Sequence, residues 1–278
     1  MAVNLFTLLV FLISLAAGLT GALTGLGGGI IVTPALTLLL GVDMRYAIGA
    51  SLVSVIATSS GAAASYVRDG LSNIRIGMFL EIATTVGAIC GALLASKTPT
   101  NALAIIFGAV LLHSAWQVTR IKADALHIIR SDPFTEKLHL NGVYYAPDGA
   151  VPYQVTNAKT GFLMMWIAGL ISGLLGIGSG ALKVIAMDRV MKIPFKVSTA
   201  TSSFMIGVTG VASATIYLKR GYIHPMIALP VMLGVLAGSM LGARLLPRMP
   251  VKVLRCIFAI AVAVIAVQMI LHGLRGRL

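Results

Sequence analysis

Two short glycine-rich runs carry the residues best suited to binding a small anion. They are Gly25-Leu26-Gly27-Gly28-Gly29 and Gly176-Ile177-Gly178-Ser179-Gly180. Each run breaks a helix between a long apolar stretch and a short one, and it exposes backbone N–H groups where the helix dipole favours negative charge. The alternative is close helix packing, which small residues also permit in membranes. The predicted substrate-binding backbone comprises Gly25, Gly27, Gly28, Gly29, Gly176, Gly178, Ser179 and Gly180.

Side chains near the runs extend this prediction. Lys183 lies three residues past the second run, where the first copy has Val32. A cation deep in a membrane costs about 2.5–3.5 kcal/mol, so we expect Lys183 to contact an anionic substrate. The alternative is a shallow helix from which Lys183 reaches the lipid headgroups. Ser51 and Ser202 are expected to donate hydrogen bonds to the substrate, although hydroxyls also join helices in membranes.

Glu81 is the one carboxylate well inside a predicted span. It is a candidate for proton coupling, but the favoured interpretation places it near the membrane surface, paired with an arginine. The five histidines have no metal-ligand spacing, and the chain has neither a Walker-type phosphate loop nor a serine elbow. We therefore expect no metal, no cofactor and no enzymatic activity.

An internal repeat explains why these features recur. A shift of 151 positions aligns residues 18–119 with 169–270 without a gap and superposes seven glycine pairs. Each copy predicts a glycine-broken helical hairpin, and the short second arms lie at 30–41 and 181–191. Three long apolar runs follow in each copy, at 46–67, 74–96 and 101–119 and at 196–218, 224–246 and 251–272.

The composition is typical of an integral membrane protein. Hydrophobic residues make up 58% of the chain, charged residues make up 10%, and the mean hydropathy is +0.97. About 20 helical residues cross a hydrocarbon layer of about 30 Å, so the six long runs predict spanning helices. We expect an all-α integral membrane protein of two inverted repeats with about 8–10 membrane segments. The net charge of +13 suits anionic lipid headgroups better than nucleic acid.

Three regions are predicted along the chain: a first membrane repeat at 1–119, a polar linker at 120–160 and a second membrane repeat at 161–278. An odd number of spans follows each hairpin, so the second repeat should be inverted relative to the first. Lysine and arginine gather in the loops on the linker's side, which we expect to be cytoplasmic. The linker is interpreted as a solvated connection, with a small hairpin over 138–155 as the alternative.

The paired glycine runs, with Pro34 after the first, resemble the TauE/SafE family of sulfite and organosulfonate exporters. The similarity covers both repeats. It implies a multi-pass permease of the bacterial inner membrane that exports sulfite, sulfoacetate or related sulfonates. The second run departs from the first, with Ser179 in place of Gly28 and Ile185 in place of Pro34. The binding site is therefore expected to be asymmetric.

Physical reasoning makes anion export the simpler direction. A membrane potential that is negative inside drives an anion outward, so export needs no coupled ion. The alternatives are a transporter of a carboxylate or a metal cation, coupled to protons, and with less support a membrane enzyme or scaffold. The expected partners are a small anionic substrate and the lipid bilayer; association into a homodimer is left open.

Overall fold

The computed structural model describes residues 3–24, 27–68, 70–119, 133–146, 149–245 and 251–276, so Gly25 and residues 120–132 of the predicted linker lie outside the described part. The first half contains α1 (Val3–Thr24), α2 (Gly29–Pro34), the π-helix η1 (Ala35–Leu39), α3 (Met44–Arg68), α4 (Ile74–Ala95) and α5 (Thr100–Thr119). Between the halves lie α6 (Pro133–Lys137), β1 (Gly142–Ala146) and β2 (Gly149–Tyr153). The second half contains α7 (Ala158–Leu175), α8 (Gly180–Ile185), the π-helix η2 (Ala186–Val190), α9 (Phe195–Lys219), α10 (Pro225–Leu245) and α11 (Val251–Leu274).

Both copies of the repeat produce the same elements at the same spacing. Every element from α2 to α5 begins 151 positions before its counterpart among α8, η2, α9, α10 and α11. The second arm of each hairpin starts as an α-helix and ends as a π-helix, so even this irregularity recurs. The local sequence of each copy therefore sets where its helices begin.

The helices confirm the predicted fold class. In the described part, six helices are long and apolar enough to cross a membrane: α1, α3, α4, α7, α9 and α10. The helices α5 and α11 contain 20 and 24 residues. The predicted second hairpin arms are short, as expected. The chain is an all-α integral membrane protein.

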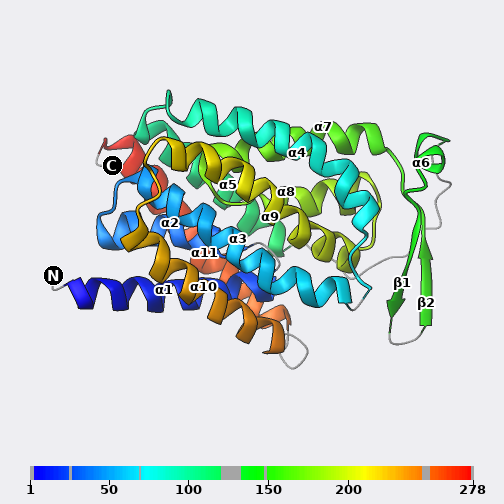
Figure 1. The fold of residues 1–278 in the computed structure, drawn as a ribbon, viewed down its shortest axis with the longest axis horizontal. Coiled ribbons are helices and arrows are strands. Elements are labelled where there is room, and N and C mark those ends of the chain that lie inside the picture. The colour runs from blue at the N-terminus through cyan, green and yellow to red at the C-terminus, as the bar shows by residue number, and fades with distance from the viewer. Residues whose placement is uncertain are drawn as a thin grey trace.

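The first helix of each half packs against a helix of the other half. Helix α1 packs along α10 of the other half, and α7 packs along α4 (Figure 1). Glycines make both contacts close, because a Cβ atom at Gly18 would overlap Val235, and one at the equivalent Gly169 would overlap Thr84. Neither half therefore has a complete set of helix contacts without the other.

The counterpart helices α3 and α9 pack directly against each other and run in opposite directions. Ser59 of α3 donates a hydrogen bond to the carbonyl of Ser203, near the start of α9. Further along α9, Gly210 lies against Ile56, which precedes Ser59. Two equivalent bundles result, one of α1, α2, α3 and α10 and one of α4, α7, α8 and α9, and they meet along α3 and α9.

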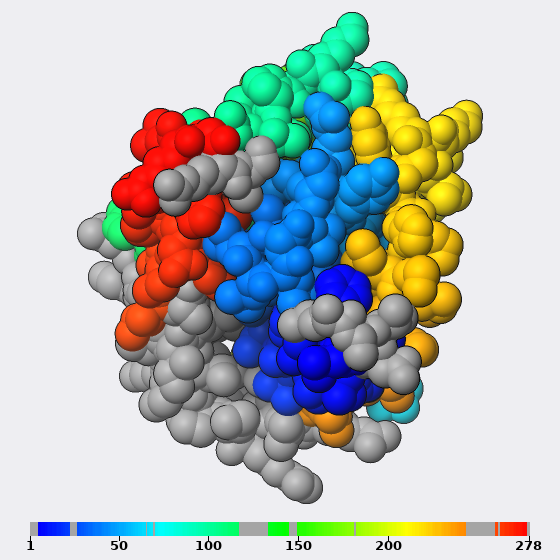
Figure 2. Space-filling model, turned by 90° about the vertical axis from the view of Figure 1, so that its left-hand side faces the viewer, coloured from blue at the N-terminus to red at the C-terminus, as the bar shows by residue number. Residues whose placement is uncertain are grey.

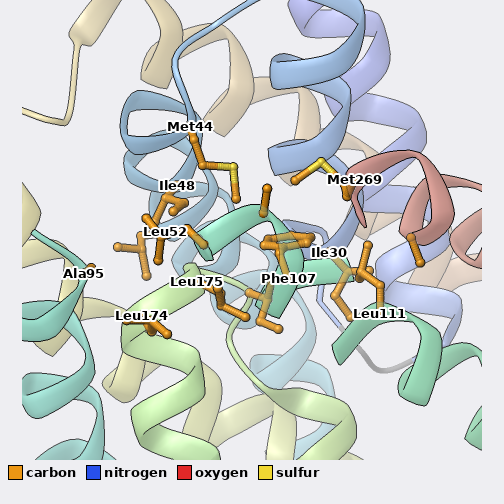
Figure 3. Packing of buried hydrophobic residues seen from close by; sticks show 14 of the residues in the cluster. Ile30, Met44, Ile48, Leu52, Ala95, Phe107, Leu111, Leu174, Leu175 and Met269 are labelled. Carbon is orange, nitrogen blue, oxygen red and sulfur yellow. The ribbon is translucent and has the colours of Figure 1, made fainter. Parts of the chain in front are cut away.

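A shared hydrophobic core joins the halves beside the hairpins. Side chains from α2, α3, α5, α7 and α11 converge in it (Figure 3). Phe107 is completely buried at its centre, with Ile30 and Leu175 nearby. Burial of this apolar surface favours a fixed position of the hairpins relative to the spanning helices.

The described part of the linker is a folded cap, so the expected solvated connection does not hold for residues 133–146 and 149–157. Strands β1 and β2 form an antiparallel hairpin at the opposite end of the helices from both chain termini (Figure 1). Tyr144 and Tyr153 are buried against Ile76 and Leu80 of α4. The Asn73 amide donates a hydrogen bond of 2.7 Å to the Tyr153 hydroxyl. Apolar side chains on one face of the hairpin account for this packing.

Positive side chains lie at both ends of the helical body. At the linker end, Arg75 donates a hydrogen bond to the carbonyl of His139. At the opposite end, seen in Figure 2 with both termini, Arg220 donates to the carbonyl of Ala92. The apolar helical surface lies between these two charged zones, as a bilayer requires.

Candidate functional site

The two glycine runs meet at the middle of α3 and α9. The Ser51 hydroxyl lies 2.8 Å from the carbonyl oxygen of Gly176 and 3.1 Å from that of Gly29, so one side chain on α3 joins both runs. On the other side, Gly178 lies against Val55 and Ile206. Both α3 and α9 contain 25 residues; Val55 and Ile206 lie near their centres, and Ser51 lies four residues nearer the start of α3.

Ser51 and Ser202 have equivalent roles in the two halves. Each hydroxyl donates to a carbonyl of its own hairpin, Ser51 to Gly29 and Ser202 to Gly180, the latter at 3.3 Å. Ser51 also reaches the opposite hairpin at Gly176. In this structure both hydroxyl protons are therefore directed at backbone carbonyls.

The Ser51→Ala substitution should destabilise the protein more than Ser202→Ala. The first removes a hydrogen bond that joins the two hairpins, and buried hydrogen bonds contribute about 0.5–1.5 kcal/mol each. The second removes only a longer bond between α9 and the hairpin of the same half. Thermal unfolding of the two purified variants in the same detergent measures the difference. Equal melting temperatures would show that the bond between the hairpins contributes nothing.

The second run has an unusual backbone. Gly27, Gly176 and Gly178 have φ angles of 83°, 68° and 72°, which glycine adopts without strain. Ser179 has a φ of 46°, although the equivalent Gly28 is right-handed at −66°. A residue with a Cβ atom is disfavoured in the left-handed region by about 1–2 kcal/mol. The asymmetry expected from the sequence is therefore a difference in backbone conformation as well as in side chains.

Lys183 is completely buried, so it does not reach the headgroups. Its Nζ atom donates a hydrogen bond of 2.6 Å to the Thr209 hydroxyl and lies 3.7 Å from Oε2 of Glu81. Glu81 is only 7% exposed. The expected arginine partner of Glu81 is thus wrong, because the carboxylate is buried in the protein and its partner is a lysine.

Hydroxyl groups surround the Glu81 carboxylate. Thr209 and Thr85 donate to Oε1 at 2.6 and 3.0 Å, and Thr84 donates to Oε2 at 2.9 Å. Lys183, Thr209 and Glu81 come from α8, α9 and α4, so both halves of the chain contribute to one polar cluster. We call these three residues and Thr84 and Thr85 the Lys183–Glu81 cluster.

The hydrogen bonds from the three threonines to Glu81 were not predicted from the sequence. Thr84 and Thr85 follow Glu81 by three and four residues, a helical spacing that could have identified them. Thr209 matches Thr58 across the repeat, but its contact with Glu81 crosses between the halves.

A small cavity lies beside the first glycine run. Its volume is about 10 Å³, and it is lined by Gly21, Ala22, Gly27, Thr58, Ser59, Ala62, Ser203 and Ile206. This volume is about the minimum that holds one water molecule, and it is too small for a sulfonate. As the described residues form it, this cavity could admit a sulfonate only after they move apart. Within the described residues, no group of three metal-ligating side chains occurs.

Comparisons with known proteins agree with this architecture. The family model described as sulfite exporter TauE/SafE matches residues 10–269. A probable membrane transporter protein of Bacillus subtilis, YunE, is 29% identical over 278 residues, which cover 97% of this chain and 98% of the relative. A second from that organism, YdhB, is 27% identical over 252 residues, covering 90% and 93%. No solved structure matches the chain. The chain therefore belongs to the sulfite exporter TauE/SafE family of membrane transporters.

Proposed function

We propose that the protein is a secondary transporter that exports small sulfur-containing anions, such as sulfite, sulfoacetate or related sulfonates, across the bacterial inner membrane. The observation that carries the proposal is the meeting of two glycine runs at mid-helix, next to the buried Lys183. Glycine backbones and hydroxyl groups can bind oxyanions without adding fixed charge, which favours release as well as binding. Membership of the family supports the substrate class.

The two halves are inverted in the membrane in this proposal. The antiparallel packing of the counterpart helices α3 and α9 supports inversion, because counterparts in a parallel repeat would run in the same direction. The linker end faces the cytoplasm, since lysine and arginine accumulate there, including Arg75, Lys137 and Lys192. Both termini then lie outside the cell.

Transport follows from movement between the two bundles. Each bundle carries one glycine run, and the runs are joined across the seam of α3 and α9 by the bond from Ser51 to Gly176. Rocking of one bundle against the other would break this bond and widen the cavity alternately toward each face. The substrate would thus meet only one side of the membrane at a time.

Efflux from vesicles tests this function. Purified protein is reconstituted into lipid vesicles loaded with sulfite, sulfoacetate or methanesulfonate, and the release of each anion is followed against protein-free vesicles. We expect release of at least one of these anions to depend on the protein. Release of citrate or a divalent cation, with none of the sulfur anions released, would contradict the proposal.

Thiol labelling in whole cells tests the orientation. Cysteines introduced at the exposed positions Lys97 and Lys137 should react with a membrane-impermeant thiol reagent from opposite sides, with Lys97 outside. Labelling of both positions from one side would contradict the proposed topology.

A further inference from the structure

The repeat supplies an internal comparison for the Lys183–Glu81 cluster. A shift of 151 positions relates Lys183, Thr209 and Glu81 to Val32, Thr58 and Met232. Thr58 and Thr209 have the same role in their helices, because each donates back to a carbonyl four residues earlier. The two charges are replaced by apolar side chains. The same helix arrangement therefore forms without an ion pair in the bundle of α1, α2, α3 and α10, and packing alone does not explain why the bundle of α4, α7, α8 and α9 has one.

Lys183 has unused capacity to bind an anion. An ammonium group has three N–H donors, and among the described residues Nζ makes one hydrogen bond, to Thr209. The distance of 3.7 Å to Glu81 exceeds the 2.7–2.9 Å that is typical of a charge-assisted hydrogen bond. Glu81 thus neutralises Lys183 without occupying all its donors.

Two buried hydroxyls without a hydrogen-bond partner belong to the same hairpin. Ser179 is 2% exposed and Ser172 is completely buried, and neither Oγ atom has a partner. The Lys183 amide donates to the carbonyl of Ser179, so Ser179 lies one turn before Lys183 at the start of α8. The Gly176 amide donates to the carbonyl of Ser172 at 2.8 Å, so Ser172 lies one turn before the second glycine run. Buried hydroxyls usually have partners, so both of these hydroxyls are available to donate to a polar ligand.

The hydroxyls around Glu81 suit a neutral carboxylic acid as well as a carboxylate. Besides Glu81, the Thr209 hydroxyl can donate to the carbonyl of Met205 at 3.0 Å. The Thr84 hydroxyl can donate to the carbonyl of Glu81 itself at 3.1 Å. When Glu81 carries a proton, these two hydroxyls can turn their own protons to the backbone carbonyls, and one of them can accept the hydrogen bond from the acid O–H. Both hydroxyls therefore still have an acceptor for their protons after Glu81 is protonated.

Other titratable groups on the packed elements are engaged elsewhere. On α4, Arg75 bonds to His139 at the linker end. On α7, Lys159 lies over the ring of Phe134, and on α9 the Tyr217 hydroxyl donates to the carbonyl of Gly173. The remaining ones are Cys90 on α4, Lys196 and Lys219 at the ends of α9, and Asp188 and Arg189 on η2. Within the described residues, Lys183 is the charged group at ion-pair distance from Glu81.

We propose that Lys183 and Glu81 form a charge switch: an oxyanion displaces Glu81 from Lys183, binds Lys183, Ser179 and Ser172, and Glu81 takes up one proton. The proposal rests on the proposed anion transport and adds its coupling. Before binding, the cluster holds one positive and one negative charge; afterwards it holds Lys183, the anion and a neutral acid. The buried net charge stays at zero, which avoids the large cost of an unpaired charge in the interior.

Coupling changes what drives transport. Each singly charged anion crosses with one proton, so the step carries no net charge and does not respond to the membrane potential. The anion gradient and the pH gradient then set the direction. In this proposal the sequence-based expectation of transport without a coupled ion is replaced by movement of the anion together with one proton.

Anion binding and proton uptake test the switch directly. Methanesulfonate is a suitable probe, because its single negative charge does not titrate in the experimental range. Addition of methanesulfonate to purified protein in weakly buffered detergent solution should remove about one proton per anion bound. Above the pH at which free Glu81 ionises, the affinity should fall about tenfold for each pH unit, since binding requires one proton.

Two variants separate the switch from a structural role. Glu81→Gln resembles the protonated acid, so it should bind methanesulfonate without proton uptake and with an affinity that no longer follows the ionisation of residue 81. The double variant Lys183→Val, Glu81→Met copies Val32 and Met232 of the other half; it should fold and bind methanesulfonate at least 100-fold more weakly.

The outcomes separate the switch from the transport proposal. Wild-type protein that binds methanesulfonate without proton uptake and with a pH-independent affinity would overturn the charge switch and leave anion transport standing. Binding by the double variant equal to wild type would also overturn it, since Lys183 would not hold the anion. If neither wild type nor Glu81→Gln bound sulfite, sulfoacetate or methanesulfonate, the transport proposal would fail as well.

Discussion

Replacing Glu81 alone by methionine is expected to destabilise the protein by about 3–5 kcal/mol, because it leaves Lys183 buried without a counter-charge. Three threonine hydroxyls would also lose an acceptor. Thermal unfolding in detergent at constant pH, without added anion, measures the loss. We expect the melting temperature to fall further than it does for Ser51→Ala.

The matched control removes both charges. The double variant Lys183→Val, Glu81→Met should recover most of the lost stability, because a buried ion pair can often be replaced by well-packed apolar residues at little cost. The residues Val32 and Met232 show that the equivalent position of this fold accepts these side chains. If the single Glu81→Met variant melted like wild type, Lys183 and Glu81 would not form a buried pair.

Adding a methyl group at Gly169 is expected to cost about 2 kcal/mol of stability and to weaken anion binding. A Cβ atom there would overlap the backbone of Thr84, which cannot move without shifting α4. The better helix propensity of alanine offsets the clash only by about 1 kcal/mol. Because Thr84 hydrogen-bonds Glu81, the displacement also changes the geometry of the Lys183–Glu81 cluster.

The repeat again supplies the control. Gly18 is the counterpart of Gly169, and a Cβ atom there would overlap Val235 in the same way. Gly18→Ala should therefore lower the melting temperature by a similar amount while leaving methanesulfonate affinity and proton uptake closer to wild type. On the lipid-facing side of α4, Val86→Ile should change neither property, since Val86 is 50% exposed. If Gly18→Ala and Gly169→Ala weakened anion binding equally, the contact of Gly169 with Thr84 would have no specific effect on the Lys183–Glu81 cluster, and this prediction would be wrong.

The sequence alone determined the membrane class, the repeat and the helices. Apolar length and glycine placement are local properties of the chain, and a run of about 20 apolar residues has few alternatives in a bilayer. The predicted spans accordingly match α3, α4, α5, α9, α10 and α11. The β-hairpin of the linker was visible in its turn residues, but its burial against α4 was not, because that contact depends on a distant surface.

Only the tertiary structure decided how the charged and hydroxyl residues are combined. Lys183 and Glu81 lie in different repeats, and no local pattern records that α4 packs beside α7, α8 and α9. The sequence therefore showed Lys183 as a cation without a partner, and it favoured a position of Glu81 near the membrane surface. Nothing in the sequence marks Ser172 as lacking a hydrogen-bond partner. Burial and pairing arise from contacts between segments far apart in the chain, so they become visible only once the helices are packed.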